Sequence, residues 1–290
     1  MVAMDLRTLC RDGIFRSADA AAAGIDGSEL RRLRASGECH RLLRGWYSVE
    51  WPVDDATGHR LRTTALVRHL GRVCPSHHSL LILRGLPTLK ADLACVHLTR
   101  LADTASRHRT GAVIHPQVDG PVTLAQAIVQ TGQLNGPLDA LVAADAALHR
   151  ALVTADDIER AVARFTRHPH SAAVRRILAL ADARTESPGE TLLRRIMLDG
   201  GLHVTPQHPV QDGSVTWRAD FVVDGTMVLV EFDGLVKYAG ADDLVAEKRR
   251  EDRLRALGYE VVRVMWADLE HPERILRAIR QAIARSRCAA

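Results

Sequence analysis

The chain has 290 residues, of which 47% are hydrophobic and 26% are charged, a composition typical of a globular protein and unlike that of a disordered one. At a usual domain size of about 150 residues, this length predicts two or three domains. The net charge of +4 permits binding to nucleic acid without requiring it. The five cysteines form no CxxC pair and no metal-ligand spacing, so we expect reduced thiols.

Targeting signals are not evident in the sequence. No uninterrupted apolar run reaches the roughly 18 residues of a membrane-spanning helix. The start, MVAMDLRTLCRDGIF, contains acidic residues and lacks the apolar stretch of a signal peptide. We therefore expect a cytoplasmic protein with no membrane partner.

The first predicted domain, residues 1–50, consists of short helices followed by a β-hairpin. Helices are predicted in LRTLCRDGIF, from Ser17, and from Ser28, which can cap a helix that ends near Gly37. The segment ECHRLLRGWYSV alternates around a turn at Arg44–Gly45. Three helices followed by a hairpin are the order of a winged helix-turn-helix.

In a winged helix-turn-helix the third helix enters a DNA groove and the wing lies near the phosphates. The residues predicted to bind DNA are therefore Arg31, Arg32 and Arg34 on the third helix, and Arg41 and Arg44 on the wing. The alternative is a solvated helix face that holds the domain together and binds nothing.

The second predicted domain, residues 51–182, is mostly helical. The segments LAQAIVQT, GPLDALVAADAALHRAL and TADDIERAVARF carry apolar residues at helical spacing. Ser76 is interpreted as a helix cap and not as a nucleophile. His77 and His78 have no third ligand at a useful spacing, so we interpret them as structural or surface histidines.

The third predicted domain, residues 183–290, has an α/β pattern. Pro188 can begin a helix that ends at the Gly200–Gly201 pair. Strands are predicted in LHVTPQHPV, TWRADFVV and MVLVEFD, with a hairpin turn at Asp224–Gly225 between the last two. A charged helix, VAEKRREDRLRALG, leads to the strand YEVVRVMW and to the final helix PERILRAIRQAIARS.

Acidic residues lie on the two strands that this turn joins. Antiparallel pairing about the turn places Asp220 opposite Glu231, and alternation along a strand points Glu231 and Asp233 to the same side. Burying like charges together is costly unless a cation compensates them. Mg²⁺ is bound by carboxylates, so Asp220 and Glu231 are candidate ligands, and Glu190 could hold a metal-bound water or a second ion. The alternative is a set of solvated acids at strand ends and in a turn.

The order of the motifs ESPGE, RADF, VEFDG and EDRLRALGYEVVRV, over about residues 185–270, resembles the PD-(D/E)xK nuclease superfamily. More narrowly, it is similar to the branch related to very-short-patch DNA repair endonucleases. The beginning of the chain resembles the winged-helix domain of antitoxins from abortive-infection type IV toxin–antitoxin systems.

The resemblance implies a multidomain protein whose C-terminal domain has a restriction-endonuclease-like α/β fold with a mixed sheet. It implies an endonuclease that hydrolyses DNA phosphodiester bonds with Mg²⁺, or Mn²⁺ as a substitute. It also suggests a homodimer, because many enzymes of the superfamily act as dimers. The implied catalytic residues are Glu190, Asp220, Glu231, Asp233 and Lys237. The alternatives are an RNA or branched-DNA substrate, or a non-enzymatic DNA-binding regulator or antitoxin with a toxin partner.

The chain departs from the superfamily pattern at Asp233, where the acid-x-Lys motif has its lysine. Lys237, within DGLVKY, is the nearest replacement and could orient the attacking water or stabilise the developing oxyanion. Lys248 is a second candidate, and Gln207 is predicted to face the same patch. The helix residues Arg249, Arg250 and Arg253 are interpreted as a solvated face, with contact to DNA phosphates as the alternative.

Overall fold

The computed structural model describes residues 6–102, 107–109, 111–117, 120–213, 215–234 and 241–288, and only the backbone of residues 107–109, 241–248 and 288. The chain groups into two compact units: Met1–Ala144 with Val153–Leu180, and Asp145–Leu152 with Ala181–Ala290. The three domains predicted from the sequence stay a prediction, and each unit is described by itself. Among the described helices, none is long and apolar enough to cross a membrane.

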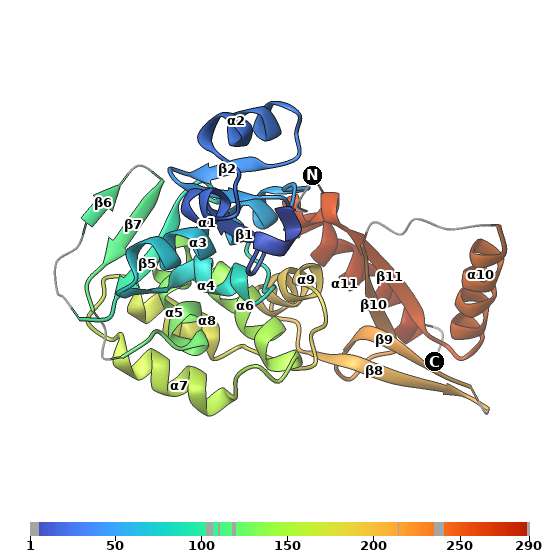
Figure 1. Ribbon diagram of the computed structural model, residues 1–290. Helices are drawn as coiled ribbons and strands as arrows, with labels where there is room; N and C mark the ends of the chain where they lie inside the picture. The colour runs from blue at the N-terminus through green and yellow to red at the C-terminus, as the bar shows by residue number, and fades with distance from the viewer. Residues whose placement is uncertain are drawn as a thin grey trace. The chain divides into compact units, whose positions relative to one another are not determined.

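The first unit begins with three short helical segments and a small antiparallel sheet (Figure 1). These elements are η1 (Leu6–Leu9), β1 (Ile14–Arg16), α1 (Ser17–Ala22), α2 (Gly27–Ala35), β2 (His40–Leu43) and β3 (Trp46–Ser48). The strand order is β1-β3-β2. The predicted turn at Arg44–Gly45 is confirmed, and Gly45 adopts a φ of 80° that glycine tolerates best. This order of elements is compatible with a winged helix-turn-helix.

Two local predictions in this segment are wrong. The first expected helix is a short 3-10 helix followed by β1, because Phe15 is buried and pairs with Tyr47 across the sheet. The cap of α2 is Asp26 and not Ser28, since the Asp26 carboxylate accepts hydrogen bonds from the Ser28 and Glu29 backbone N–H groups.

The rest of the first unit combines helices with a second sheet. Its elements are α3 (Asp55–Leu70), β4 (Val73–Pro75), α4 (His77–Leu83), β5 (Val96–Arg100), β6 (Arg107–Arg109), β7 (Ala112–His115), α5 (Leu124–Asn135), α6 (Pro137–His149), α7 (Ala155–Arg164) and α8 (Ser171–Leu178). The last residues of α6 are grouped with the second unit. The sheet order is β4-β5-β7-β6, with β5 and β7 parallel. The sequence did not predict this sheet, because strands of three to five residues are too short to show a period.

The second unit follows the predicted order of elements. These are α9 (Pro188–Asp199), β8 (Val204–Asp212), β9 (Val215–Val223), β10 (Val228–Asp233), α10 (Ala241–Ala256), β11 (Glu260–Met265), η2 (Trp266–Glu270) and α11 (Pro272–Cys288). The sheet order is β11-β10-β9-β8, and it is mixed because β10 and β11 run parallel. One core cluster joins the sheet to α9 and α11, and a second joins it to Leu254 of α10.

Candidate functional site

Asp220 and Glu231 lie side by side where β9 and β10 stop pairing. These strands place Phe221 opposite Val230, and the next position in the same register brings Asp220 opposite Glu231. Beyond this point the Asp220 side chain replaces a strand carbonyl as acceptor, since the Phe232 N–H donates to Oδ2 of Asp220 at 2.7 Å. The predicted opposition of the two acids is confirmed.

Glu190 approaches this acidic pair from the first turn of α9. Ser187 caps the helix and Pro188 takes its first position, where a proline needs no hydrogen-bond donor. The Glu190 carboxylate is buried and accepts hydrogen bonds from the Glu186 N–H at 3.0 Å and from Nε2 of Gln207 at 3.2 Å. Gln207 faces the patch, as predicted, and holds a strained left-handed conformation with a φ of 54°.

The closeness of α9 to β10 depends on a glycine. A Cβ added to Gly189 would lie 2.0 Å from the ring of Phe232, a distance that no side chain tolerates. Gly189 therefore lets the first turn of α9, with Glu190, lie directly against the strand that carries Glu231.

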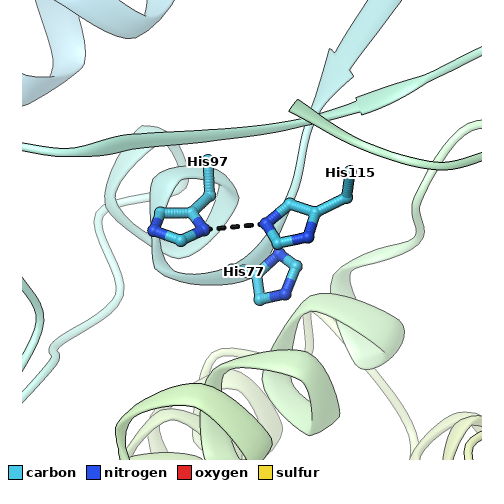
Figure 2. Close-up of side chains that lie close together, drawn as sticks. All are labelled: His77, His97 and His115. Carbon is cyan, nitrogen blue, oxygen red and sulfur yellow. Dashed lines mark hydrogen bonds between the residues drawn. The ribbon is translucent and has the colours of Figure 1, made fainter. Parts of the chain in front are cut away.

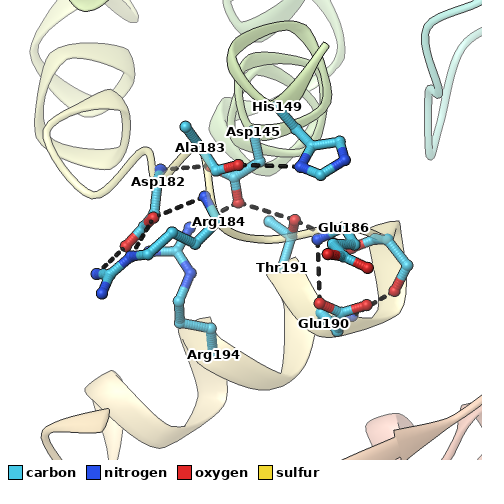
Figure 3. A network of polar contacts seen from close by, with 10 residues as sticks. Asp145, His149, Asp182, Ala183, Arg184, Glu186, Glu190, Thr191 and Arg194 are labelled. Carbon is cyan, nitrogen blue, oxygen red and sulfur yellow. Dashed lines mark hydrogen bonds and ion pairs between the residues drawn. The ribbon is translucent and has the colours of Figure 1, made fainter. Parts of the chain in front are cut away.

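A buried polar network fixes the same turn of α9 (Figure 3). Asp145, 1% exposed, accepts hydrogen bonds from Nη2 of Arg194 at 2.6 Å and from Oγ1 of Thr191 at 2.8 Å. The other carboxylate oxygen of Asp145 accepts from the Asp182 N–H at 2.8 Å. Thr191 is the residue after Glu190, so the network holds the backbone that carries the acid.

The electrostatics of the patch disfavour a further negative charge. Burial raises the pKa of Asp220 to about 6. The hydrogen bond from Phe232 opposes this rise in pKa, whereas the neighbouring charges of Glu190 and Glu231 add to it. A cation near Asp220 would relieve this repulsion.

Two guanidinium groups lie beside the Glu231 carboxylate and compensate its negative charge. Glu231 is 7% exposed, and its carboxylate forms an ion pair with Arg250 of α10 and lies 4.0 Å from Nε of Arg263 on β11. The prediction of a solvated face is therefore wrong for Arg250, because a buried carboxylate requires compensating charge. Arg249 and Arg253 are exposed, as expected.

Two further residues were predicted to belong to the site, Asp233 and Lys237. Asp233 is half-buried at the end of β10, opposite Met265 of β11. Lys237 and its neighbour Tyr238 lie outside the described residues, as does the side chain of Lys248. The assistance of a lysine therefore stays a prediction.

The three carboxylates are suitable ligands for a hard cation but do not form a closed cage. Within the described part of the chain, the cluster that could hold a metal ion consists of histidines in the first unit, and not of Glu190, Asp220 and Glu231. Oxygen donors match Mg²⁺, which is commonly held by one or two carboxylates together with water and phosphate. Binding of Mg²⁺ or Mn²⁺ here stays a prediction.

The arginines predicted to bind DNA are all exposed. They are Arg31, Arg32 and Arg34 on α2, Arg41 on β2, and Arg44 in the turn before β3. Leu30 and Leu33 of α2 pack into the core, whereas Arg31, Arg32 and Arg34 of the same helix are exposed. Arg32 pairs with Glu29 at 2.5 Å in an exposed contact of the helix surface.

Comparison with known proteins adds a sequence-family match, two curated relatives and a weak structural likeness. Residues 7–49 match a sequence family described as "Transcriptional regulator, AbiEi antitoxin". Over 153 residues the chain is 31% identical to uncharacterized proteins of Mycobacterium tuberculosis strains CDC 1551 / Oshkosh and H37Rv, covering 52% of this chain and 56% of each relative. The chain thus spans about half the length of the curated relatives it matches.

The structural likeness is to the catalytic domain of the homing endonuclease I-Bth0305I. It covers 34% of this chain and 95% of that chain, with 18% sequence identity and a TM-score of 0.28. A likeness this weak does not establish a shared fold.

Proposed function

We propose that the protein binds DNA through α2 and the β2–β3 hairpin and acts as a transcriptional regulator of the antitoxin type. The observation that carries the proposal is the set of exposed arginines on the segment 7–49, which matches a family described as transcriptional regulators. A toxin partner follows from the antitoxin interpretation, and both this partner and a homodimer stay predictions.

The geometry of α2 supports this role. The helix anchors its apolar side through Leu30 and Leu33, so Arg31 and Arg34 extend from a rigid support. Arginine side chains bind phosphate oxygens and the edges of guanine, and a helix fits the major groove. The hairpin would place Arg41 and Arg44 near the phosphates.

DNA binding is tested by fluorescence anisotropy with duplexes of about 30 base pairs, which offer roughly three helical turns. We expect affinity to fall steeply with salt, because binding releases counterions. Joint replacement by Arg31→Glu and Arg34→Glu should weaken binding at least about tenfold. The matched control is Arg175→Glu with Arg176→Glu, which makes the same charge change on the exposed side of α8. Equal losses in both variants would contradict a specific role for α2.

A second candidate function is a divalent-metal-dependent nuclease in the second unit. It is favoured by one observation: Asp220 lies partly buried beside Glu190 and Glu231, with its pKa raised to about 6. In this proposal Asp220 and Glu231 would hold Mg²⁺ or Mn²⁺, and Glu190 could hold a metal-bound water or a second ion. A bound divalent ion lowers the pKa of water and neutralises charge on a phosphate.

The chain's own residues would prepare this reaction. Asp220 must lose its proton before it can bind a cation, and Glu231 must exchange at least part of its contact with Arg250. The proposed role of Lys237 is to orient the attacking water, and that of Asp233 is to adjust the charge of the site.

Nuclease activity is tested by incubating plasmid, single-stranded DNA and RNA with Mg²⁺ or Mn²⁺. We expect Asp220→Asn to reduce cleavage by roughly a hundredfold or more. Asp252→Asn, at an exposed aspartate of α10, is the matched control and should cleave normally. Retained DNA binding without cleavage of any of the three substrates by the unmodified protein would leave a regulator with a degenerate nuclease-like unit.

A further inference from the structure

Three histidines converge in the first unit, apart from both sites described above. His77 begins α4, His97 lies on β5 and His115 ends β7, and their rings face one another (Figure 2). One nitrogen from each imidazole lies within 4.8 Å of the other two. The ring centroids of His77 and His115 are 4.1 Å apart, and each lies 5.1 Å from that of His97. The sequence offered His77 no third ligand, whereas the structure gives it two partners.

The fold brings these residues together through the sheet. β5 and β7 run parallel, with His97 opposite Val113 and Thr99 opposite His115. His97 and His115 therefore lie on adjacent strands, two residues apart in register and on the same face of the sheet. The start of α4 is tied to β5, because the Ser76 N–H donates to the carbonyl of His97 at 3.1 Å. Each histidine is therefore positioned by a different element.

Backbone strain and a neighbouring hydroxyl orient His77. Its φ is 49°, a left-handed conformation that a residue with a large side chain rarely adopts. Its N–H donates to Oε1 of Gln130 at 3.3 Å, and its Nδ1 lies 3.0 Å from Oγ of Ser76. Strain of this kind persists where the surroundings hold a side chain in place, and it is frequent at functional sites. A hydrogen bond to one ring nitrogen also directs the other, as in the outer shell of metal sites.

The spacing of two of the rings is close to that of two ligands on one metal ion. Burial holds the pKa of His77 well below its usual range, and the neighbouring rings of His115 and His97 lower it further. Nδ1 of His97 lies 2.9 Å from Nε2 of His115. Two nitrogen ligands at 2.0–2.1 Å on one tetrahedral ion are about 3.3 Å apart, so a small rotation of the two rings would admit an ion.

Nearby histidines show the contrasting structural arrangement. His59 uses both ring nitrogens within the protein, at 2.8 Å from the carbonyl of Leu93 and 2.8 Å from Oγ of Ser79. Nε2 of His78 lies 3.1 Å from the carbonyl of Cys95. These two histidines tie elements together, as predicted for His78, whereas one nitrogen from each of His77, His97 and His115 lies within 4.8 Å of the other two.

We propose that His77, His97 and His115 bind a transition-metal ion of the Zn²⁺ class. The donors that the described residues bring together here are three imidazoles, which favour Zn²⁺, Co²⁺, Ni²⁺ or Cu²⁺ over Mg²⁺ or Ca²⁺. Three protein ligands leave a fourth position for water or a small ligand. The ion would join α4, β5 and β7, and it is independent of any Mg²⁺ at the carboxylates of the second unit.

The proposal is tested with the full chain, stripped of metal by chelation and titrated with Zn²⁺ in competition with a chromophoric chelator. We expect one tight equivalent per chain, and His115→Gln should weaken it at least about tenfold, since even outer-shell changes cost 10–100-fold. His203→Gln, at an exposed histidine of the second unit, is the matched control and should leave the titration unchanged. Circular dichroism shows whether the His115→Gln variant folds.

A second measurement requires no substitution. Zn²⁺ should protect His115, the half-buried member of the cluster, from acylation by diethyl pyrocarbonate in the unmodified protein, and Mg²⁺ should not. Peptide mass spectrometry locates the modified histidines, with His203 as the internal reference. Absence of a tight Zn²⁺ equivalent, unchanged affinity in a folded His115→Gln variant, or protection confined to other histidines would each overturn the proposal.

Discussion

At the scale of single residues, the proton on Asp220 controls the charge of the acidic patch. Burial raises the pKa of its carboxyl from 3.8 to about 6 in the folded chain. A group whose pKa rises on folding contributes stability that is fully present below its unfolded pKa. That stability is lost as the pH increases through the folded pKa. Asp220 therefore favours the folded state near pH 4 more than near pH 7.

We expect the ionisation of Asp220 to lower the free energy of unfolding by roughly 2–3 kcal/mol as the pH rises from about 4 to 7. The Asp220→Asn variant should lose that part of the pH dependence, because its amide oxygen can still accept the Phe232 N–H but cannot titrate. Urea unfolding at a series of pH values measures the effect, with Asp252→Asn as the exposed control. An unchanged pH profile in Asp220→Asn would show that Asp220 has an ordinary pKa.

Sequence alone could place Asp220 opposite Glu231, because the turn at Asp224–Gly225 sets the register of its two strands. It could not find Arg250, which reaches Glu231 from 19 residues further along the chain. Which arginine of a charged helix faces the sheet depends on how Leu254 packs, and that is a tertiary property. The histidine cluster was missed for a similar reason, since its members lie on three elements with no local motif.

At the scale of secondary-structure elements, α9 depends on the buried pair of Arg194 and Asp145. Removing one partner of such a pair leaves the other charge buried without compensation, at a cost of about 3–5 kcal/mol. We expect Asp145→Asn to lower the free energy of unfolding by about 3 kcal/mol, as measured by urea unfolding. Asp199→Asn is the matched control on α9, because it removes an exposed pair with Arg195 worth less than about 1 kcal/mol. Equal losses would contradict the role of the buried pair.

Elements were predictable where each carried its own start and stop signals. The second unit has such signals in Pro188, Gly200 and the Asp224–Gly225 turn, and its observed order matches the prediction. The sheet of β4 to β7 has short strands whose stability comes from pairing across the unit, so its sequence lacks a clear period. Asp145 and Arg194 lie 49 residues apart, which also puts their pairing beyond local pattern.

At the scale of the whole molecule, the second unit is not one continuous stretch of chain. It combines Asp145–Leu152, which includes the end of α6, with Ala181–Ala290. The boundary predicted from the change in sequence pattern would start a domain at residue 183. Such a fragment would contain Arg194 without Asp145.

We therefore expect the fragment 183–290 to be less stable than the second unit within the full chain by about 3 kcal/mol or more. The direction of the stability change caused by one substitution tests whether the missing Asp145 is the cause. Arg194→Met should destabilise the full chain, because it leaves Asp145 buried without its cation. It should leave the fragment unchanged or more stable, because the fragment does not contain Asp145. Urea unfolding of both forms measures this difference. Equal destabilisation in fragment and full chain would mean that Arg194 acts through packing within residues 183–290, independently of Asp145.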